Sequence, residues 1–102
     1  MRFERTDSFK ADYQRLTDSE KELFRGAIRA INSAFDRRTP GQAPAWPRRL
    51  RIRSVAGARG VFEMTWSFAG PDGRATFEFV NMEGETGIRW RRVGGHAIFG
   101  EP

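Results

Sequence analysis

The sequence predicts an α+β fold in which two helices precede an antiparallel sheet. Apolar residues recur at helical spacing between residues 9 and 35, and they alternate with polar residues between residues 50 and 93. A stretch from Asp36 to Pro47 separates the two patterns, because its prolines remove backbone donors and favour extended or turning geometry. We therefore expect the helices to pack on one face of the sheet.

The helical half begins with an expected short strand at residues 2–6. Asp7 or Ser8 is predicted to cap a first helix that ends near Leu16 and carries Phe9 and Tyr13 on its apolar face. Thr17-Asp-Ser-Glu20 has the spacing of a capping box and predicts the start of a second helix. The apolar stripe of this helix contains Leu23, Phe24, Ala27, Ile28, Ile31 and Phe35.

Four strands are expected in the second half, near residues 49–53, 61–68, 74–80 and 88–93. Gly70-Pro-Asp-Gly73 predicts a tight turn, because proline presets one backbone angle and glycine admits positive φ, so the second and third strands should form a hairpin. The polar face of the aligned strands would be rich in arginine and contain two carboxylates, and His96 would lie at its end. This face comprises Arg49, Arg51, Arg53, Glu63, Thr65, Arg74, Thr76, Glu78, Arg89 and Arg91.

Length and charge restrict the class of protein. The 102 residues fit a single domain, residues 1–102, and the net charge is +5. Sixteen of the basic residues are arginines, which favour planar, bidentate contact with phosphate or carboxylate groups. Seven of them lie between Arg37 and Arg59, where there is no acidic residue. Such a positive field suits an RNA backbone or an acidic protein partner equally well.

The composition also excludes several kinds of site. The chain has no cysteine, which excludes disulfides and thiolate zinc sites, and its single histidine excludes a cluster of histidine ligands. We expect no metal and no organic cofactor. No segment has the apolar length of a signal peptide or a membrane span, so a cytoplasmic protein without membrane contact is expected.

His96 is the first candidate for chemistry. Imidazole takes up and releases a proton near neutral pH, and His96 follows a Gly-Gly pair at the end of a basic strand. A proton-transfer group beside arginines suggests chemistry on a phosphodiester. The alternative is a histidine that packs or is solvated near the end of the chain.

Other residues could contribute to such a site. Arg74 could stabilise the charge that develops on a phosphate, or it could pair with a glutamate across the strands. Glu63 or Glu78 could accept the proton of a ribose 2'-hydroxyl, although ion pairing with arginine is the stronger expectation for both. Arg49, Arg51 and Arg53 form a predicted basic ladder for contact with a polyanion, and Arg89 and Arg91 extend it.

The three tryptophans are candidate platforms for base stacking. Trp66 and Trp90 fall on the apolar side of their strands and are expected in the core. Trp46 lies in the proline-rich loop and is the freer candidate to stack on an RNA base.

Five stretches in order carry a family resemblance: Phe9-Lys-Ala-Asp-Tyr-Gln-Arg-Leu16, Arg49-Leu-Arg-Ile-Arg53, Gly60-Val-Phe-Glu-Met-Thr-Trp66, Gly73-Arg-Ala-Thr-Phe77 and Val93-Gly-Gly-His-Ala-Ile-Phe99. Together they resemble the RelE/ParE superfamily of toxins from type II toxin-antitoxin systems. The resemblance implies a short N-terminal strand and a helical hairpin packed on a curved antiparallel sheet.

The resemblance also implies an activity. Toxins of the RelE-like branch enter the ribosome and cleave mRNA by attack of a 2'-hydroxyl group, without a cofactor. Arg74 falls where that branch has an arginine that stabilises the phosphate, and His96 falls near a basic or histidine residue at the end of the last strand. Glu63 and Thr65 stand where some relatives carry lysine, and Phe99 stands about where many place a tyrosine.

Two other functions remain open from the sequence. Toxins of the ParE-like branch poison DNA gyrase without cutting RNA, which is the second hypothesis. The third hypothesis is a module that only binds an acidic partner through its arginines. The resemblance further implies a cognate antitoxin with an acidic or amphipathic segment, to which a protein of charge +5 is complementary.

Overall fold

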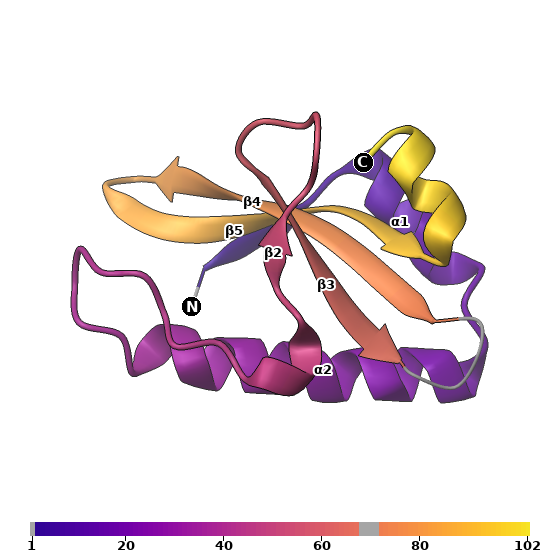
Figure 1. Ribbon diagram of the computed structural model, residues 1–102, viewed down its shortest axis with the longest axis horizontal. Helices are drawn as coiled ribbons and strands as arrows, with labels where there is room; N and C mark the ends of the chain where they lie inside the picture. Colours follow the sequence, from indigo (N-terminus) through magenta and orange to yellow (C-terminus); the bar gives the residue numbers. More distant parts are fainter. Residues whose placement is uncertain (1, 68–71) are drawn as a thin grey trace.

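The computed structural model describes residues 2–67 and 72–102 (Figure 1). Its elements in chain order are β1 (Phe3–Arg5), α1 (Asp7–Gln14), α2 (Asp18–Asp36), the 3-10 helix η1 (Arg48–Leu50), β2 (Arg53–Ser54), β3 (Val61–Ser67), β4 (Gly73–Met82), β5 (Glu85–Gly94) and the 3-10 helix η2 (His96–Gly100). The predicted α+β class is confirmed. Among the described residues, no helix combines the length and apolar character that crossing a membrane requires.

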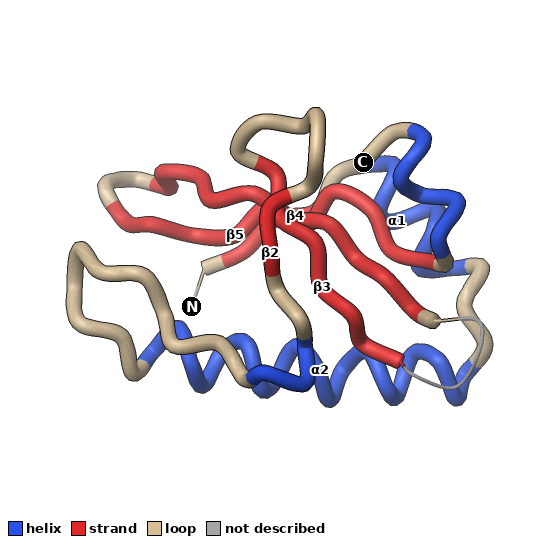
Figure 2. Tube along the Cα trace, viewed as in Figure 1, coloured by secondary structure: helices blue, strands red, loops and turns tan. Residues whose placement is uncertain are grey.

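The strands form one sheet in the order β1-β5-β4-β3-β2. Neighbouring strands are antiparallel except β1 and β5, which are parallel, so the short N-terminal strand joins the sheet beside the last strand. The long helix α2 runs across the sheet, and α1 lies at the end of the molecule where η2 and the C-terminus are found (Figures 1 and 2). The predicted turn at Gly70–Gly73 falls largely outside the described residues, but the antiparallel pairing of β3 with β4 is as predicted.

Both helices begin at a threonine. The capping box predicted for α2 is present, because Glu20 N–H donates to Thr17 Oγ1 at 3.1 Å and Thr17 N–H donates to Glu20 Oε1 at 2.8 Å. The cap of α1 is Thr6, one residue before the predicted Asp7 and two before the predicted Ser8. Thr6 Oγ1 accepts from Phe9 N–H at 3.1 Å and donates to the Arg91 carbonyl at 2.7 Å, so the same hydroxyl caps α1 and ties its start to β5.

The core lies between α2 and the sheet. The ring of Phe24 meets Trp90 at a centroid distance of 5.4 Å and Trp66 at 5.8 Å, both edge-on, which is a favourable geometry for aromatic pairs. Trp66 and Trp90 are therefore core residues, as predicted. The buried cluster around them consists of Phe9, Phe24, Ala27, Ile31, Phe35, Leu50, Met64, Trp66, Ala75, Phe77, Ile88, Trp90 and Val93.

The predicted strand at residues 49–53 is wrong. Arg48–Leu50 forms η1, Arg51 has a left-handed backbone with φ 47°, and only Arg53–Ser54 pairs with β3. Pro47 precedes η1 and has the fixed φ that starts a helical turn, and the turn places Leu50 in the core. The alternation of arginine with leucine and isoleucine here comes from a helical turn that buries Leu50, and not from a strand.

A buried carboxylate connects α1 to β5. Asp12, whose side chain is only 6% exposed, accepts from Arg92 Nε at 2.6 Å, from Arg92 Nη2 at 3.1 Å and from Val93 N–H at 3.2 Å. The hydrogen bond to Asp12 raises the pKa of Arg92, against the effect of burial, which lowers it. This contact lies at a β-bulge, because Thr76 pairs with Arg92 and Phe77 with Trp90, which leaves Arg91 as the additional residue.

Replacing Asp12 by asparagine should destabilise the protein by about 2–4 kcal/mol, because the largely buried guanidinium of Arg92 would lose its counter-charge. Urea unfolding of the variant measures this loss. Glu22→Gln is the matched control: Glu22 pairs with Arg25 and Arg29 in solvent, and its loss should change stability by no more than about 0.5 kcal/mol. Equal effects of the two substitutions would contradict the structural role of Asp12.

Gly73→Ala and Gly26→Ala should change stability in opposite directions. A Cβ at Gly73 would lie 2.5 Å from Cε2 of the core residue Trp66, so this variant should lose about 1–3 kcal/mol. A Cβ at Gly26 would meet only the end of Arg29 at 3.7 Å, so alanine in this helix should add about 0.5–1 kcal/mol. Thermal unfolding of both variants tests the packing between β4 and Trp66.

Candidate functional site

Strand pairing brings three of the predicted site segments together. Arg74 of β4 lies between Thr65 of β3 and Gly94 of β5, and Gly94 is two residues before His96. Glu63 opposes Thr76 in the next row of the same face, so it lies diagonal to Arg74 across the β3–β4 pair. The face away from α2 therefore carries a corner, defined by Arg74, Gly94, Gly95 and His96, with Glu63 one row farther along the strands.

Arg74 is held in place at this corner. Its side chain is 12% exposed, its Nη2 lies 3.3 Å from Asp72 Oδ2, and its backbone carbonyl accepts from Trp66 Nε1 at 2.8 Å. The ion-pair partner of Arg74 is Asp72, whereas the sequence suggested Glu63 or Glu78 as a partner across the strands. One local carboxylate leaves the planar guanidinium with further donors for an anion.

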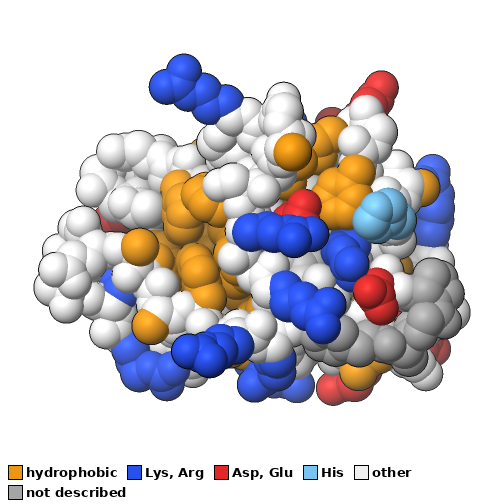
Figure 3. All heavy atoms as spheres, in the orientation of Figure 1, with side chains coloured by type: hydrophobic (Ala, Val, Ile, Leu, Met, Phe, Trp, Pro, Cys, Tyr) orange, Lys and Arg blue, Asp and Glu red, His pale blue; other side chains and the backbone are white. Residues whose placement is uncertain are grey.

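His96 is the exposed member of the corner. It begins η2, and its ring meets Phe99 edge-on at a centroid distance of 5.1 Å. In Figure 3 the chain's single histidine, drawn pale blue, lies on the same face as several lysine and arginine side chains. Phe99 has no hydroxyl group, and its place here is to support the imidazole ring. The ring is thus accessible to solvent and packs against Phe99.

A crevice opens beside the corner. It has a volume of about 340 Å³, and its lining includes Asp72, Gly94 and Gly95 together with Arg15 and Arg92. Asp72 lines this crevice and pairs with Arg74, whereas Arg74 and His96 are not among its lining residues. The described residues contain no group of three or more histidine, aspartate or glutamate side chains that could hold a metal ion.

Glu63 is held in an ion pair. Its side chain is 13% exposed and its Oε1 accepts from Arg53 Nε at 2.7 Å. The opposing Thr76 is fully buried and donates to the Pro102 carbonyl at 2.9 Å, so the end of the chain folds over this part of the face. Glu63 would have to release Arg53 before its carboxylate could act on another group.

Arg89 and Arg91 belong to a charge-balanced cluster. Glu78 pairs with both, at 3.2 Å from Arg89 Nη1, and Glu4 also pairs with Arg89. The hydrogen bond to Glu4 raises the pKa of Arg89 above its ordinary value. Two cations thus share two carboxylates, and the strongly basic surface predicted here is largely neutralised. Phosphate contact by these arginines would require them to exchange partners.

The predicted basic ladder is divided between different elements. Arg49 is exposed on η1, Arg51 follows η1 in its left-handed conformation, and Arg53 on β2 pairs with Glu63. Trp46 is half-buried, because its ring stacks on Phe79 at a centroid distance of 6.4 Å. Together with Phe35, Phe62 and Phe79, Trp46 lines an apolar hollow of about 330 Å³. Figure 3 shows apolar side chains gathered on the face of the molecule that it draws.

Sequence reasoning missed the pair formed by Asp12 and Arg92, although both left a signal. Asp12 lies three residues after Phe9 and one before Tyr13, on the apolar side of α1, where a carboxylate needs a partner. Apolar residues of β5 are spaced by three at Trp90 and Val93, where a regular strand has a spacing of two. That interruption is the mark of the bulge that brings Arg92 to Asp12.

Comparison with known proteins supplies one structural relative. No family model matches the sequence, and no curated protein matches it significantly. A solved structure, the YoeB/ParE toxin from Agrobacterium tumefaciens, matches with a TM-score of 0.63 at 14% sequence identity, over 94% of this chain and 99% of that chain. The fold of this chain is therefore RelE/ParE-like, as the motif order predicted.

Proposed function

We propose that this protein is the toxin of a toxin-antitoxin system and that it cleaves mRNA on the ribosome. The observation that carries the proposal is the pairing of Arg74 with Gly94, which joins a largely buried arginine to the segment that bears His96. The likeness to a YoeB/ParE toxin over 94% of the chain supports it. Such a protein acts in the cytoplasm and is neutralised by an acidic antitoxin, to which its charge of +5 is complementary.

The proposed reaction is transfer of a phosphodiester to the neighbouring 2'-hydroxyl group. The 2'-oxygen forms a new bond to phosphorus, the bond from phosphorus to the 5'-oxygen breaks, and the products are a cyclic phosphate and a free 5'-hydroxyl group. One proton leaves the 2'-oxygen and one reaches the 5'-oxygen, so the net transfer needs an acid and a base but no metal ion. The nucleophile is already present in the substrate.

Arg74 and His96 have the properties that this reaction requires. The forked guanidinium of Arg74 would stabilise the negative charge that grows on the phosphate oxygens. The exposed imidazole of His96 would exchange a proton with the reacting oxygens. Glu63 is the proposed third participant as the base for the 2'-hydroxyl, and its pairing with Arg53 makes this the weakest of the three roles.

Inhibition of DNA gyrase is the second candidate function. The charge-balanced cluster of Arg89, Arg91, Glu4 and Glu78 favours it, because this part of the face offers little uncompensated charge to an RNA backbone. Phe99 also lacks the hydroxyl group that many nucleolytic relatives have. A chain that neither cleaves RNA nor inhibits gyrase would be a module that binds an acidic protein.

His96→Gln and Arg74→Lys should each slow cleavage of ribosome-bound mRNA by about 10²- to 10⁴-fold, because one removes a proton-transfer group and the other a bidentate phosphate ligand. Primer extension on translated transcripts measures the rate. The control is Arg29→Ala, on the solvent side of α2, which should leave the rate unchanged. Thermal unfolding confirms that each variant is folded.

Wild-type cleavage rates in both variants would overturn the assignment of the corner. No cleavage by the wild-type protein, together with loss of supercoiling by purified gyrase, would support the second candidate. Transcript-end mapping in expressing cells separates the two, since only the nuclease produces cuts that depend on translation.

Arg49→Ala should weaken binding to single-stranded RNA and reduce the slope of log affinity against log salt by about one, as expected for the loss of one phosphate contact. Arg49 is exposed on η1 in the arginine-rich segment. Arg29→Ala on α2 should change neither quantity. A slope that is identical in all three proteins would assign Arg49 to ordinary surface.

A further inference from the structure

The segment Glu101–Pro102, called the closing segment below, lies on the face of the sheet that carries the corner. Thr76 of β4 falls between the core residues Ala75 and Phe77, so its side chain points to the face away from α2. Its hydroxyl donates to the Pro102 carbonyl at 2.9 Å. Figure 1 shows the end of the chain on the side of the sheet opposite α2. The closing segment therefore covers Thr76, which is fully buried.

The donors that hold the closing segment are of the kind that also binds phosphate. Arg91 Nε donates to the Pro102 carbonyl at 3.1 Å, and Arg92 Nη1 donates to the Glu101 carbonyl at 3.1 Å. The Pro102 oxygen thus accepts from a hydroxyl group and from a guanidinium. Threonine and arginine are both among the side chains that bind phosphate oxygens in nucleic-acid complexes. A phosphate oxygen in place of this carbonyl would find the same two donors already in position.

Arg91 can bind a phosphate here and keep its carboxylate partner. Its Nη1 pairs with Glu78, whereas its Nε is the donor to Pro102. Departure of the closing segment would therefore free Nε and leave the pair with Glu78 in place. Hydrogen bonds between two ionised groups are roughly twice as strong as those between neutral groups. An RNA phosphate is therefore a stronger ligand for Arg91 than the neutral Pro102 carbonyl.

The position of Thr76 relative to Arg74 fits the repeat of an RNA backbone. The two residues lie on the same face of β4, two positions apart, which places them about 6.7 Å apart along the strand. Neighbouring phosphates of an extended RNA strand are separated by a similar distance. With the reacting phosphate at Arg74, the adjacent phosphate would reach Thr76 and Arg91. Glu63, the proposed base, opposes Thr76 on β3, so the closing segment also lies beside this residue.

Open space adjoins the closing segment. A crevice of about 370 Å³ includes both residues of the segment in its lining, together with Arg91, Arg92 and Ser8. Glu101 is exposed, and the core lies on the other face of the sheet. The segment can therefore move into solvent without exposing the core, as surface segments of low local stability do.

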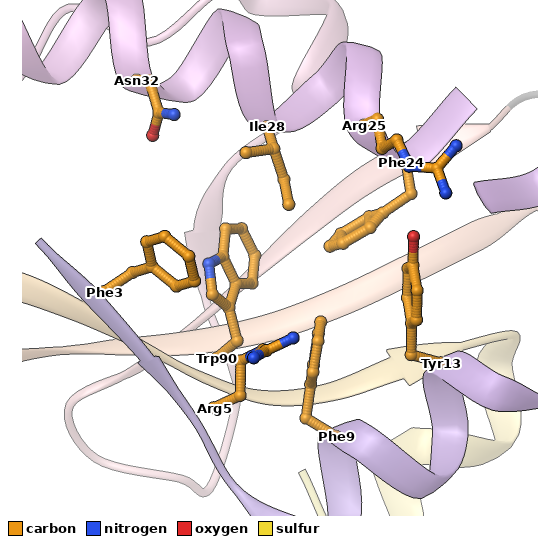
Figure 4. A pocket seen from close by; sticks show the side chains of 9 residues that line it. All are labelled: Phe3, Arg5, Phe9, Tyr13, Phe24, Arg25, Ile28, Asn32 and Trp90. Carbon is orange, nitrogen blue, oxygen red and sulfur yellow. The ribbon is translucent and has the colours of Figure 1, made fainter. Parts of the chain in front are cut away.

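The cavity on the α2 side of the sheet has a different chemistry. It has a volume of about 170 Å³, and its lining is mainly apolar, with Phe9, Phe24 and Trp90 among its walls (Figure 4). A phosphate that left water for such walls would lose its hydration without gaining equivalent hydrogen bonds. The donors that suit a phosphate are at the closing segment, where a hydroxyl group and a guanidinium face the same oxygen.

We infer that Thr76 and Arg91 form a second phosphate subsite beside the corner, and that the closing segment occupies this subsite until RNA displaces it. The inference rests on the proposed function, because it takes RNA as the ligand of this face. The subsite binds the phosphate next to the one at Arg74 and takes no part in bond breaking. Thr76 and Arg91 are thus substrate-binding residues, and the closing segment is an internal competitor of RNA.

A spin label on the closing segment tests the displacement. Glu101→Cys supplies the attachment site in a chain that otherwise has no cysteine, and it keeps the backbone carbonyl that Arg92 holds. The probe is a 2'-O-methyl hexauridylate, whose blocked 2'-oxygens prevent cleavage. We expect the label to be largely immobile in the free protein and to become mobile in proportion to the RNA bound, which fluorescence anisotropy measures independently.

Thr76→Val and Thr76→Ser in the labelled chain test the subsite. The mobile fraction of the label in each free protein gives the population with an open subsite, and the affinity divided by this fraction is the affinity of the open subsite. Thr76→Val keeps the shape of the side chain without its hydroxyl, so this corrected affinity should fall about tenfold or more, as expected for one hydrogen bond to a charged group. Thr76→Ser keeps the hydroxyl and should bind RNA nearly as tightly as the wild-type chain.

Thr86→Val is the matched control, because Thr86 is an exposed threonine near the start of β5. It should change neither the label nor the affinity. RNA that binds while the label stays immobile, or equal corrected affinities of Thr76→Val and Thr76→Ser, would overturn the inference and leave the proposed function intact. Absence of RNA binding would overturn both. Displacement of the label by RNA in a protein that cuts no mRNA would support the inference and overturn the proposed reaction.

Discussion

The contact of Asp12 with Arg92 and Val93 is the constraint on which the arrangement of the molecule depends. A buried carboxylate is tolerated only with its partners in place, so α1 has to lie where β5 can supply a guanidinium and a backbone N–H. The β-bulge at Arg91 and Arg92 brings them there. The course of β5 beyond the bulge then sets the pairing of Gly94 with Arg74, and hence the position of His96.

The charge of the protein is organised locally. Glu4 and Glu78 neutralise Arg89 and Arg91, Glu63 pairs with Arg53, and Asp72 pairs with Arg74. The net charge of +5 is therefore not spread as one field over the sheet. One region keeps functional potential: the corner at the end of β5, where Arg74 lies beside Gly94, two residues before His96.

Prediction was accurate where local physics decides the structure. The capping box at Thr17 and the helical spacing of Phe24, Ala27, Ile31 and Phe35 depend on residues close in sequence, and both are confirmed, whereas Leu23 of the same predicted stripe is 50% exposed. Strands β3 and β4 form near the predicted residues, but Thr65 and Thr76 of their predicted polar face are buried. Prediction failed at residues 49–53, where alternation came from a turn with one buried leucine. Period-two spacing alone does not distinguish a strand from such a turn, and Pro47 was the sign that a turn begins here.

The sequence by itself determined the fold class, the two helices and the core positions of Trp66 and Trp90, because apolar periodicity and capping residues act over a few neighbouring positions. Only the tertiary structure decided which charges pair, that β1 lies beside β5, and that Arg74 stands next to the segment of His96. These features join residues that are far apart along the chain. Their energies depend on desolvation and on distance in space, neither of which is encoded in local spacing.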